Sequence, residues 1–233
     1  MRPGYDESPI NALPPVVWAL VLPMIAAEAV FGLGAIGLIG GAQGIGMRLN
    51  ALEMTAYYPQ LPVRMMELGV FSARQAARVL TYPFIHESVT HALLVIVFSL
   101  ALGKMVAEQF RPWAVVALFF GSSIGGAAVY TLFGVTSGLP LAPLIGGYPA
   151  VYGFVGAFTF LLWVRLGMED ANRMRAFTLI GMLLLFQLVF GLLFGNAGYA
   201  WIAEISGFGI GFLSCFLLVP GGWARAMQTI RRR

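Results

Sequence analysis

The chain has little charge, one cysteine and two histidines among its 233 residues. Charged residues make up 10% of it, whereas about a quarter of the residues in an average soluble domain are charged. Cys215 cannot form an intramolecular disulfide, and no histidine lies near it at ligand spacing. Residues 1–15 contain Asp6, Glu7 and several prolines where a signal peptide would have a basic region. These absences argue against a soluble domain, a cysteine metal site and a cleaved signal peptide.

Long apolar runs are what the chain does contain. Hydrophobic residues make up 59% of the sequence, and its mean hydropathy is +0.84. A helix needs about 20 mostly apolar residues to cross a bilayer, and six stretches reach that length. We therefore expect an all-α membrane protein, a six-transmembrane-helix bundle. The expected spans are Val16–Ile39, Leu80–Val106, Trp113–Phe133, Ile145–Leu166, Phe177–Phe194 and Tyr199–Val219.

The basic residues predict how the chain is oriented. We divide it into an N-terminal segment (1–15), a membrane domain (16–219) and a basic tail (220–233). Lysine and arginine occur after the second and fourth spans and in the tail, whereas the connections after the third and fifth spans contain neither. Because basic residues stay on the cytoplasmic side, we expect both termini to be cytoplasmic. The connection of residues 40–79 is an exception, since its four arginines fall on the predicted outer side.

The connection of residues 40–79 mixes these arginines with leucine, methionine, tyrosine and phenylalanine. From Ala51 to Val79 the mixture has helical spacing, which is typical of interfacial helices in the headgroup region. A water-exposed cap folded on itself is the alternative. The net charge of +4 is spread over helix ends and requires no nucleic-acid partner. The tail is expected to contact anionic lipid.

Three motifs contain most of the polar groups in the predicted spans. The first, Thr81–His91, holds two histidines that do not share a helix face and that lack a third zinc ligand. The second, Gly146–Gly153, has glycine and proline at a helix start but lacks the lysine and hydroxyl of a phosphate loop. The third, Glu204–Gly211, places a carboxylate in an apolar helix, which is a functional-site hypothesis by default. We expect no metal and no cofactor.

Small residues and one further carboxylate complete the set of notable positions. Gly207 and Gly211 permit close approach of the last span to a neighbour, and Gly121 and Gly125 form a similar face for packing within the bundle. Glu28, in the first span, is expected to have a partner on a neighbouring helix or to reach the interface. A proton path through Glu28 is the alternative.

In their order, on the second, fourth and sixth spans, the three motifs resemble the rhomboid family of intramembrane serine proteases. Thr81–His91 is similar to the family's helix-two signature, Gly146–Gly153 to its Gly-x-Ser-Gly element, and Glu204–Gly211 to its His-x-Gly-Gly segment. The resemblance implies a six-helix bundle with a water-accessible cavity and a lateral gate for substrate helices. The two ends of the chain resemble rhomboid-like proteins of alphaproteobacteria, which implies a bacterial inner membrane.

The departures from this pattern fall on the chemical groups. Tyr148 stands at the position of the nucleophilic serine, Glu204 at that of the general-base histidine and Val95 at that of an oxyanion-binding asparagine. Two residues of the family's chemical apparatus remain, His91 and Gly146. The resemblance implies that His91 helps to stabilise the oxyanion. The chain therefore resembles a rhomboid pseudoprotease.

An acyl-transfer site needs a nucleophile within hydrogen-bond reach of a base. No serine, threonine or cysteine lies between Ser137 and Tyr152, so a small shift of the alignment supplies no nucleophile. We predict that serine proteolysis is lost. Tyr148 and Glu204 are expected to form a hydrogen-bonded structural pair with His91 nearby. A site for a ligand or a substrate helix at the same residues is the alternative.

Three functions remain open from the sequence. The first is a pseudoprotease that binds transmembrane client proteins laterally without cleaving them, with membrane lipids as further partners. The second is an active intramembrane serine-type endopeptidase with an unorthodox site, because a fold alone leaves activity open. The third is a proton or solute carrier built around Glu28, His91 and Glu204, although the sequence shows no internal repeat of the transporter kind.

Overall fold

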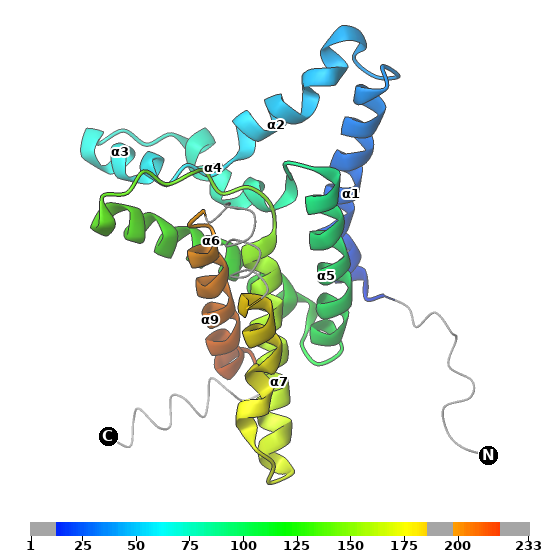
Figure 1. Cartoon of the computed structure of the whole chain (residues 1–233), viewed down its shortest axis with the longest axis vertical. Helices are drawn as coiled ribbons and strands as arrows, with labels where there is room; N and C mark the ends of the chain where they lie inside the picture. Colours follow the sequence, from blue (N-terminus) through cyan, green and yellow to red (C-terminus); the bar gives the residue numbers. More distant parts are fainter. Residues whose placement is uncertain (1–12, 186–197, 220–233) are drawn as a thin grey trace, which may run out of the picture.

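The fold is a bundle of long helices with three short helices at one end (Figure 1). The computed structural model describes residues 13–185 and 198–219. Residues 178–185 are helical, and in the described part the one pairing of strand type is an isolated bridge between Tyr57 and Leu144. The other elements are α1 (Pro15–Ala35), η1 (Gly41–Gly46), α2 (Met47–Thr55), α3 (Gln60–Leu68), α4 (Ala73–Thr81), η2 (Tyr82–Phe84), α5 (Val89–Ala107), α6 (Pro112–Ser137), α7 (Tyr148–Met168), η3 (Arg173–Phe177) and α9 (Trp201–Leu218).

Five described helices are long and apolar enough to cross a membrane, namely α1, α5, α6, α7 and α9. They correspond to five of the six expected spans, and they confirm the all-α membrane fold. The remaining expected span, Phe177–Phe194, is helical over residues 178–185. Its residues 186–194 lie outside the described part of the chain.

The second expected span, Leu80–Val106, is wrong at its start. Leu80 belongs to the end of α4, and α5 begins only at Val89. Ser88 has an extended backbone, and its Oγ accepts a hydrogen bond from the amide of His91 at 3.2 Å. A serine in this position satisfies one of the unpaired amides of a helix start. The cap therefore sets the boundary that the apolar pattern placed too early.

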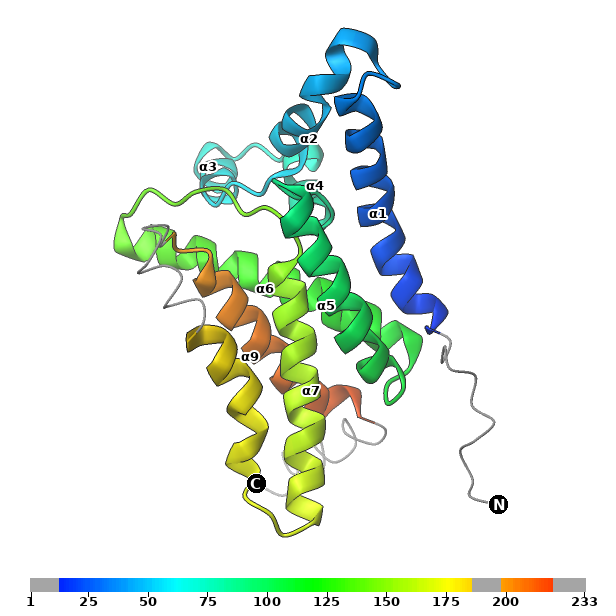
Figure 2. The same cartoon turned by 45° about the vertical axis from the view of Figure 1, so that its right-hand side comes forward.

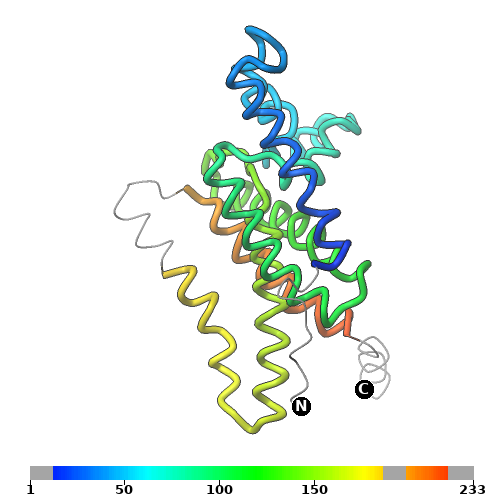
Figure 3. The backbone as a smooth tube through the Cα atoms, turned by 90° about the vertical axis from the view of Figure 1, so that its right-hand side faces the viewer, coloured from blue at the N-terminus to red at the C-terminus, as the bar shows by residue number. Residues whose placement is uncertain are grey.

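The central helix of the bundle is α7, which packs against α5, α6 and α9. Figure 2 shows α7 between α5 and α9, and residues 149–157 of α7 are all buried. Side chains from neighbouring helices complete the core around it, among them Val95, Leu118 and the single cysteine, Cys215. The start of α1 and the end of α9 lie on the side of the bundle away from α2 (Figure 3).

The connection of residues 40–79 forms α2, α3 and α4 at one end of the molecule (Figure 1). Four apolar side chains on α3 and the turn after it are largely exposed, at Met66, Leu68, Val70 and Phe71. We call these four residues the apolar edge. Exposed apolar groups beside arginines agree with an interfacial segment, and the interfacial position itself stays a prediction.

Candidate functional site

The two histidines lie at the entrance to α5. His86 is fully buried in the link between η2 and α5, and His91 is partly buried in the first turn of α5. Their rings meet edge to face, with centroids 5.0 Å apart and an interplanar angle of 78°. In one continuous helix the two histidines would not share a face. The chain is not helical between η2 and α5, and this break brings their rings together. In the described part of the chain, no group of three potential metal ligands occurs.

The turn that precedes α7 packs on both histidines. Gly146 has a φ of +82°, and its amide donates to the carbonyl of Tyr82 at 3.0 Å. A Cβ at this position would lie 2.6 Å from Nε2 of His91 and 2.9 Å from Cδ2 of His86. The next amide, that of Gly147, donates to Nε2 of His86 at 3.4 Å. Position 146 therefore requires glycine for its left-handed backbone and for its contact with the imidazoles.

His86 is a neutral packing group near neutral pH. Because Nε2 accepts a hydrogen bond, the proton of the neutral ring is assigned to Nδ1. Burial, followed by the nearby His91 and Arg48, lowers the pKa of His86 to about 3. Its Nδ1 is buried and has no hydrogen-bond partner among the described residues. A ring of this kind does not exchange protons near pH 7.

Tyr148 is the first residue of α7, and its ring stacks on His91. The ring centroids are 4.9 Å apart and the planes differ by 16°. Such aromatic pairs contribute about 0.5–1.5 kcal/mol beyond their buried area. The hydrogen-bonded pair of Tyr148 and Glu204 that we expected stays a prediction.

Glu204 lies in the first turn of α9 and has 7% of its surface exposed. It interacts electrostatically with the phenols of Tyr148 and Tyr152. The partial positive charge at a helix start favours a carboxylate there. The sequence analysis missed Tyr152, although its position four residues after Tyr148 puts both phenols on one face of α7. The carboxylate of α9 thus lies close to two phenols of α7.

The wall of the site beside the glycine turn is apolar. Val95 is fully buried one turn after His91, and a Cβ added to Gly147 would lie 2.8 Å from its Cγ1. Valine cannot donate the hydrogen bond that stabilises an oxyanion. Ser206, near Glu204 in sequence, donates its Oγ to the carbonyl of its own helix four residues earlier, at 2.6 Å. The Oγ of Ser123 likewise donates to a carbonyl of its own helix, that of Phe119, at 2.9 Å.

A family profile for the Rhomboid domain matches residues 73–221. This range covers more than half of the chain and contains all three motifs. The chain belongs to the rhomboid family. A search of curated proteins gave no match. The resemblance that the motifs suggested is thus confirmed at the level of the family and of its multi-pass membrane fold.

The expected site positions of this rhomboid converge on one place, built from α5, α7 and α9. Gly146 and Tyr148 contact His91 directly. Val95 lies one turn further along α5, and Glu204 approaches from α9. The side chains that meet there include an imidazole, phenols and a carboxylate, and the Oγ of Ser88 accepts from the backbone amide of His91. This arrangement can bind polar groups and can hold helices together.

Glycines on α9 bring that helix against α7. A Cβ on Gly207 would collide with the carbonyl oxygen of Pro149, and one on Gly211 with that of Gly153. Small residues at both positions therefore allow the two helix backbones to touch. This contact holds Glu204, which precedes Gly207 by one turn, at the start of α7.

On α6 the contact with α9 differs from the expected Gly121 and Gly125 face. A Cβ on Gly125 would collide with the side chain of Ile210, whereas one on Gly121 would meet open space among the described residues. Gly126 makes the second close approach, because its Cβ would lie 2.5 Å from the carbonyl oxygen of Ala203. Adjacent glycines, and not a pair four residues apart, form this face.

The sequence analysis also missed an arginine at the edge of the site. Arg48 of α2 forms a two-point ion pair with Glu28 of α1, at 2.8 and 2.7 Å, and donates to the carbonyl of His86 at 2.8 Å. Its guanidinium lies over the ring of Phe31, 4.9 Å from the centroid. Glu28 therefore has a partner on a neighbouring helix, as we expected, and that helix, α2, belongs to the connection of residues 40–79. The sequence did contain a signal for this contact, namely a basic residue shortly after the first span.

Proposed function

We propose that this rhomboid binds transmembrane client helices laterally without cleaving them, in a bacterial inner membrane with both termini in the cytoplasm. The stack of Tyr148 on His91 is the observation that carries the proposal. By resemblance, the nucleophilic serine would stand at residue 148. An aromatic ring fills this position and covers the histidine that would assist the oxyanion.

The donors around this position support the loss of acyl-transfer chemistry. An oxyanion hole needs hydrogen-bond donors that are available when charge develops on the substrate. The amide of Gly146 is engaged by the carbonyl of Tyr82, and that of Gly147 by the ring of His86. Val95 offers no donor at all. A peptide carbonyl that reached this place would therefore lack these three means of stabilisation.

The outward face of α5 supplies the apolar surface that a client helix would contact. Leu93, Leu94 and Val97 are all exposed, and they follow His91 within two turns. Helix association in a bilayer depends on close packing and on interhelical hydrogen bonds. A client helix with a polar group near its outer end can combine both, by packing on α5 and reaching the polar site.

Site-specific photo-crosslinking tests this proposal. A photoreactive residue replaces Leu93 in the full chain, which is reconstituted in liposomes with a single-span membrane protein. Trp113, which is 58% exposed at the start of α6, is the matched control because it lies near the opposite end of α5. We expect crosslinks to intact client from position 93 in clear excess over position 113. Equal crosslinking at both positions, or a crosslinked cleavage fragment, would count against the proposal.

A further inference from the structure

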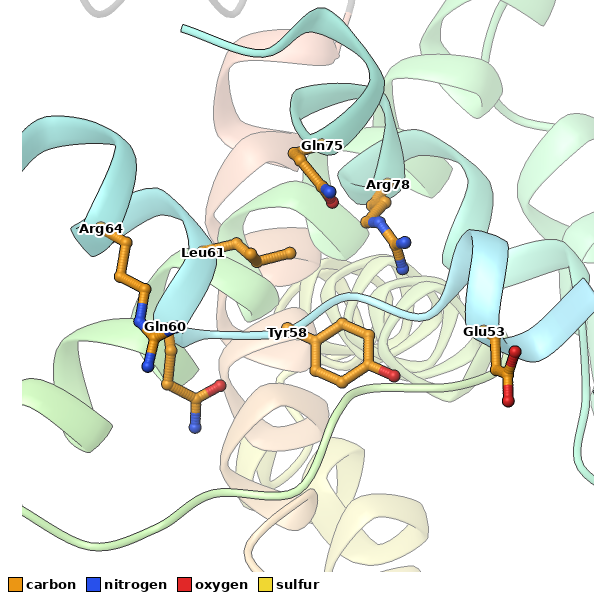
Figure 4. A pocket seen from close by; sticks show the side chains of 7 residues that line it. All are labelled: Glu53, Tyr58, Gln60, Leu61, Arg64, Gln75 and Arg78. Atoms are coloured by element: carbon orange, nitrogen blue, oxygen red, sulfur yellow. The ribbon is translucent and has the colours of Figure 1, made fainter. Parts of the chain in front are cut away.

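A polar pocket lies among α2, α3 and α4, apart from the site of the histidines (Figure 4). Its volume is about 350 Å³. Arg78, Gln75 and Tyr58 are the more buried residues that line it, whereas Arg64 and Glu53 are exposed at its rim. Figure 4 shows Arg64 and Glu53 on opposite sides of Tyr58.

Arg78 is the residue that makes this pocket a built site. It is 8% exposed, its Nη1 donates to the carbonyl of Ala56 at 2.8 Å, and its guanidinium lies over the ring of Tyr58. Its Nε is buried and has no partner among the described residues, and the same holds for Oε1 of Gln75. Buried polar atoms are costly to leave without a hydrogen bond. An anion bound beside the guanidinium of Arg78 would offset part of the cost of burying this charged side chain.

The charges of the lining residues define the chemistry of such a group. Two guanidiniums, of Arg64 and Arg78, favour an anion, and guanidinium geometry suits phosphate oxygens. The carboxylate of Glu53, across the pocket, favours a cation. Together they match a zwitterion that has a phosphate at one end and an ammonium group at the other.

The surroundings of the pocket indicate where a zwitterion of this kind occurs. The apolar edge, Met66, Leu68, Val70 and Phe71, lies on the same connection and follows Arg64 along α3. Exposed apolar side chains next to arginines are the pattern of a segment that lies at the headgroup level of a bilayer. A phospholipid whose acyl chains ran along the apolar edge could place its headgroup in the pocket.

We propose that this pocket binds a phosphoethanolamine group, with the phosphate on Arg64 and Arg78 and the ammonium on Glu53. The lipid phosphatidylethanolamine and free phosphoethanolamine share this chemistry. The site does not depend on client binding, because none of its residues belongs to the site of Tyr148 and His91.

Native mass spectrometry of the detergent-purified full chain tests the proposal. The probes are dioleoyl phosphatidylethanolamine and dioleoyl phosphatidylglycerol, the second of which has the phosphate but no ammonium group. The variants Arg64→Gln and Glu53→Gln change exposed rim residues, and Arg74→Gln removes an exposed charge of α4 outside the pocket.

We expect the wild type to bind phosphatidylethanolamine about tenfold more tightly than phosphatidylglycerol, the effect of one charge-assisted contact. Arg64→Gln should weaken this binding about tenfold, by the same arithmetic. Glu53→Gln should remove the preference for the amine, and Arg74→Gln should behave as the wild type.

Equal binding of the two lipids by the wild type, or equal effects of Arg64→Gln and Arg74→Gln, would overturn the proposal. Competition with free phosphoethanolamine distinguishes the two sources of the ligand. Displacement of the lipid at comparable concentration identifies the headgroup alone as sufficient, and retention of the lipid shows that the acyl chains are required. Crosslinking from position 93 to a client should be unchanged in Arg64→Gln. If the lipid proposal fails, the test of client binding is therefore unaffected.

Discussion

Replacement of Gly146 by alanine tests the contact between the glycine turn and the histidines. Two costs add at this position. A left-handed backbone costs a residue other than glycine about 1–2 kcal/mol. The new Cβ would lie 2.6 Å from Nε2 of His91, so the ring or the turn must move, and overpacking of this kind costs about 1–3 kcal/mol. We therefore expect Gly146→Ala to lower the free energy of unfolding by about 2–5 kcal/mol.

Gly138 is the matched control for this change. It ends α6 with a φ of +68°, and a Cβ there would meet open space among the described residues. Gly138→Ala should therefore measure the backbone cost alone, about 1–2 kcal/mol. The assay is equilibrium unfolding of the purified protein in mixed micelles of a mild detergent and sodium dodecyl sulfate, followed by circular dichroism.

A second replacement isolates the histidine. His91→Ala in the Gly146→Ala background removes the ring that the new methyl group would strike. The double variant should then lose clearly less than the sum of the two single variants, because the residues are in contact. The reasoning is refuted if Gly146→Ala costs no more than Gly138→Ala, or if the two changes are additive.

Three further predictions use the same unfolding assay. Arg48→Ala leaves the partly buried carboxylate of Glu28 and the carbonyl of His86 without their donor, so it should lower the free energy of unfolding by about 2–4 kcal/mol. Arg48→Lys should recover only part of this loss. Equal stability of the wild type and both variants would contradict the ion pair. Gly211→Ala should cost about 2 kcal/mol or more, because its methyl group would meet the α7 backbone. Gly209→Ala, whose methyl group would meet open space among the described residues, should be neutral. Burial lowers the pKa of His86 from 6.5 to about 3, so the unfolded chain takes up this proton first. Stability should therefore fall as pH drops from about 6.5 toward 3, and His86→Gln should reduce that fall.

The apolar runs of the sequence predicted the fold because a bilayer restricts the available solutions. A stretch of about 20 apolar residues must cross as a helix, since lipid offers no partner for the backbone. The residues at which the helices begin and end were less predictable. The start of α5 is set by Ser88 and not by hydropathy, so the apolar count joined Leu80 to a helix that begins at Val89.

The place of the site was predictable, but its contacts were not. The three motifs indicated that His91, Gly146 and Glu204 would come together, and the structure brings them to the ends of α5, α7 and α9. The stack of Tyr148 on His91 depends on the side-chain rotamer and on the broken helix before Ser88, neither of which leaves a periodic signal.

The ion pair at the edge of the site shows a second limit of sequence patterns. Arg48 and Glu28 are 20 residues apart and belong to different helices. Their pairing follows from the way the connection of residues 40–79 folds back over α1, which spacing along the chain does not encode. Tyr152, in contrast, could have been found, because it lies one helical turn after Tyr148.

Cleavage of a single-span substrate in liposomes is the most direct test of the central claim. The wild type is incubated beside Tyr148→Ala and Glu204→Ala, and fragments are measured by mass spectrometry against liposomes without the protein. Our account predicts no fragment above this background from any of the three proteins. Fragments that the wild type produces and that both variants fail to produce would contradict it, and would make Tyr148 and Glu204 part of a working protease.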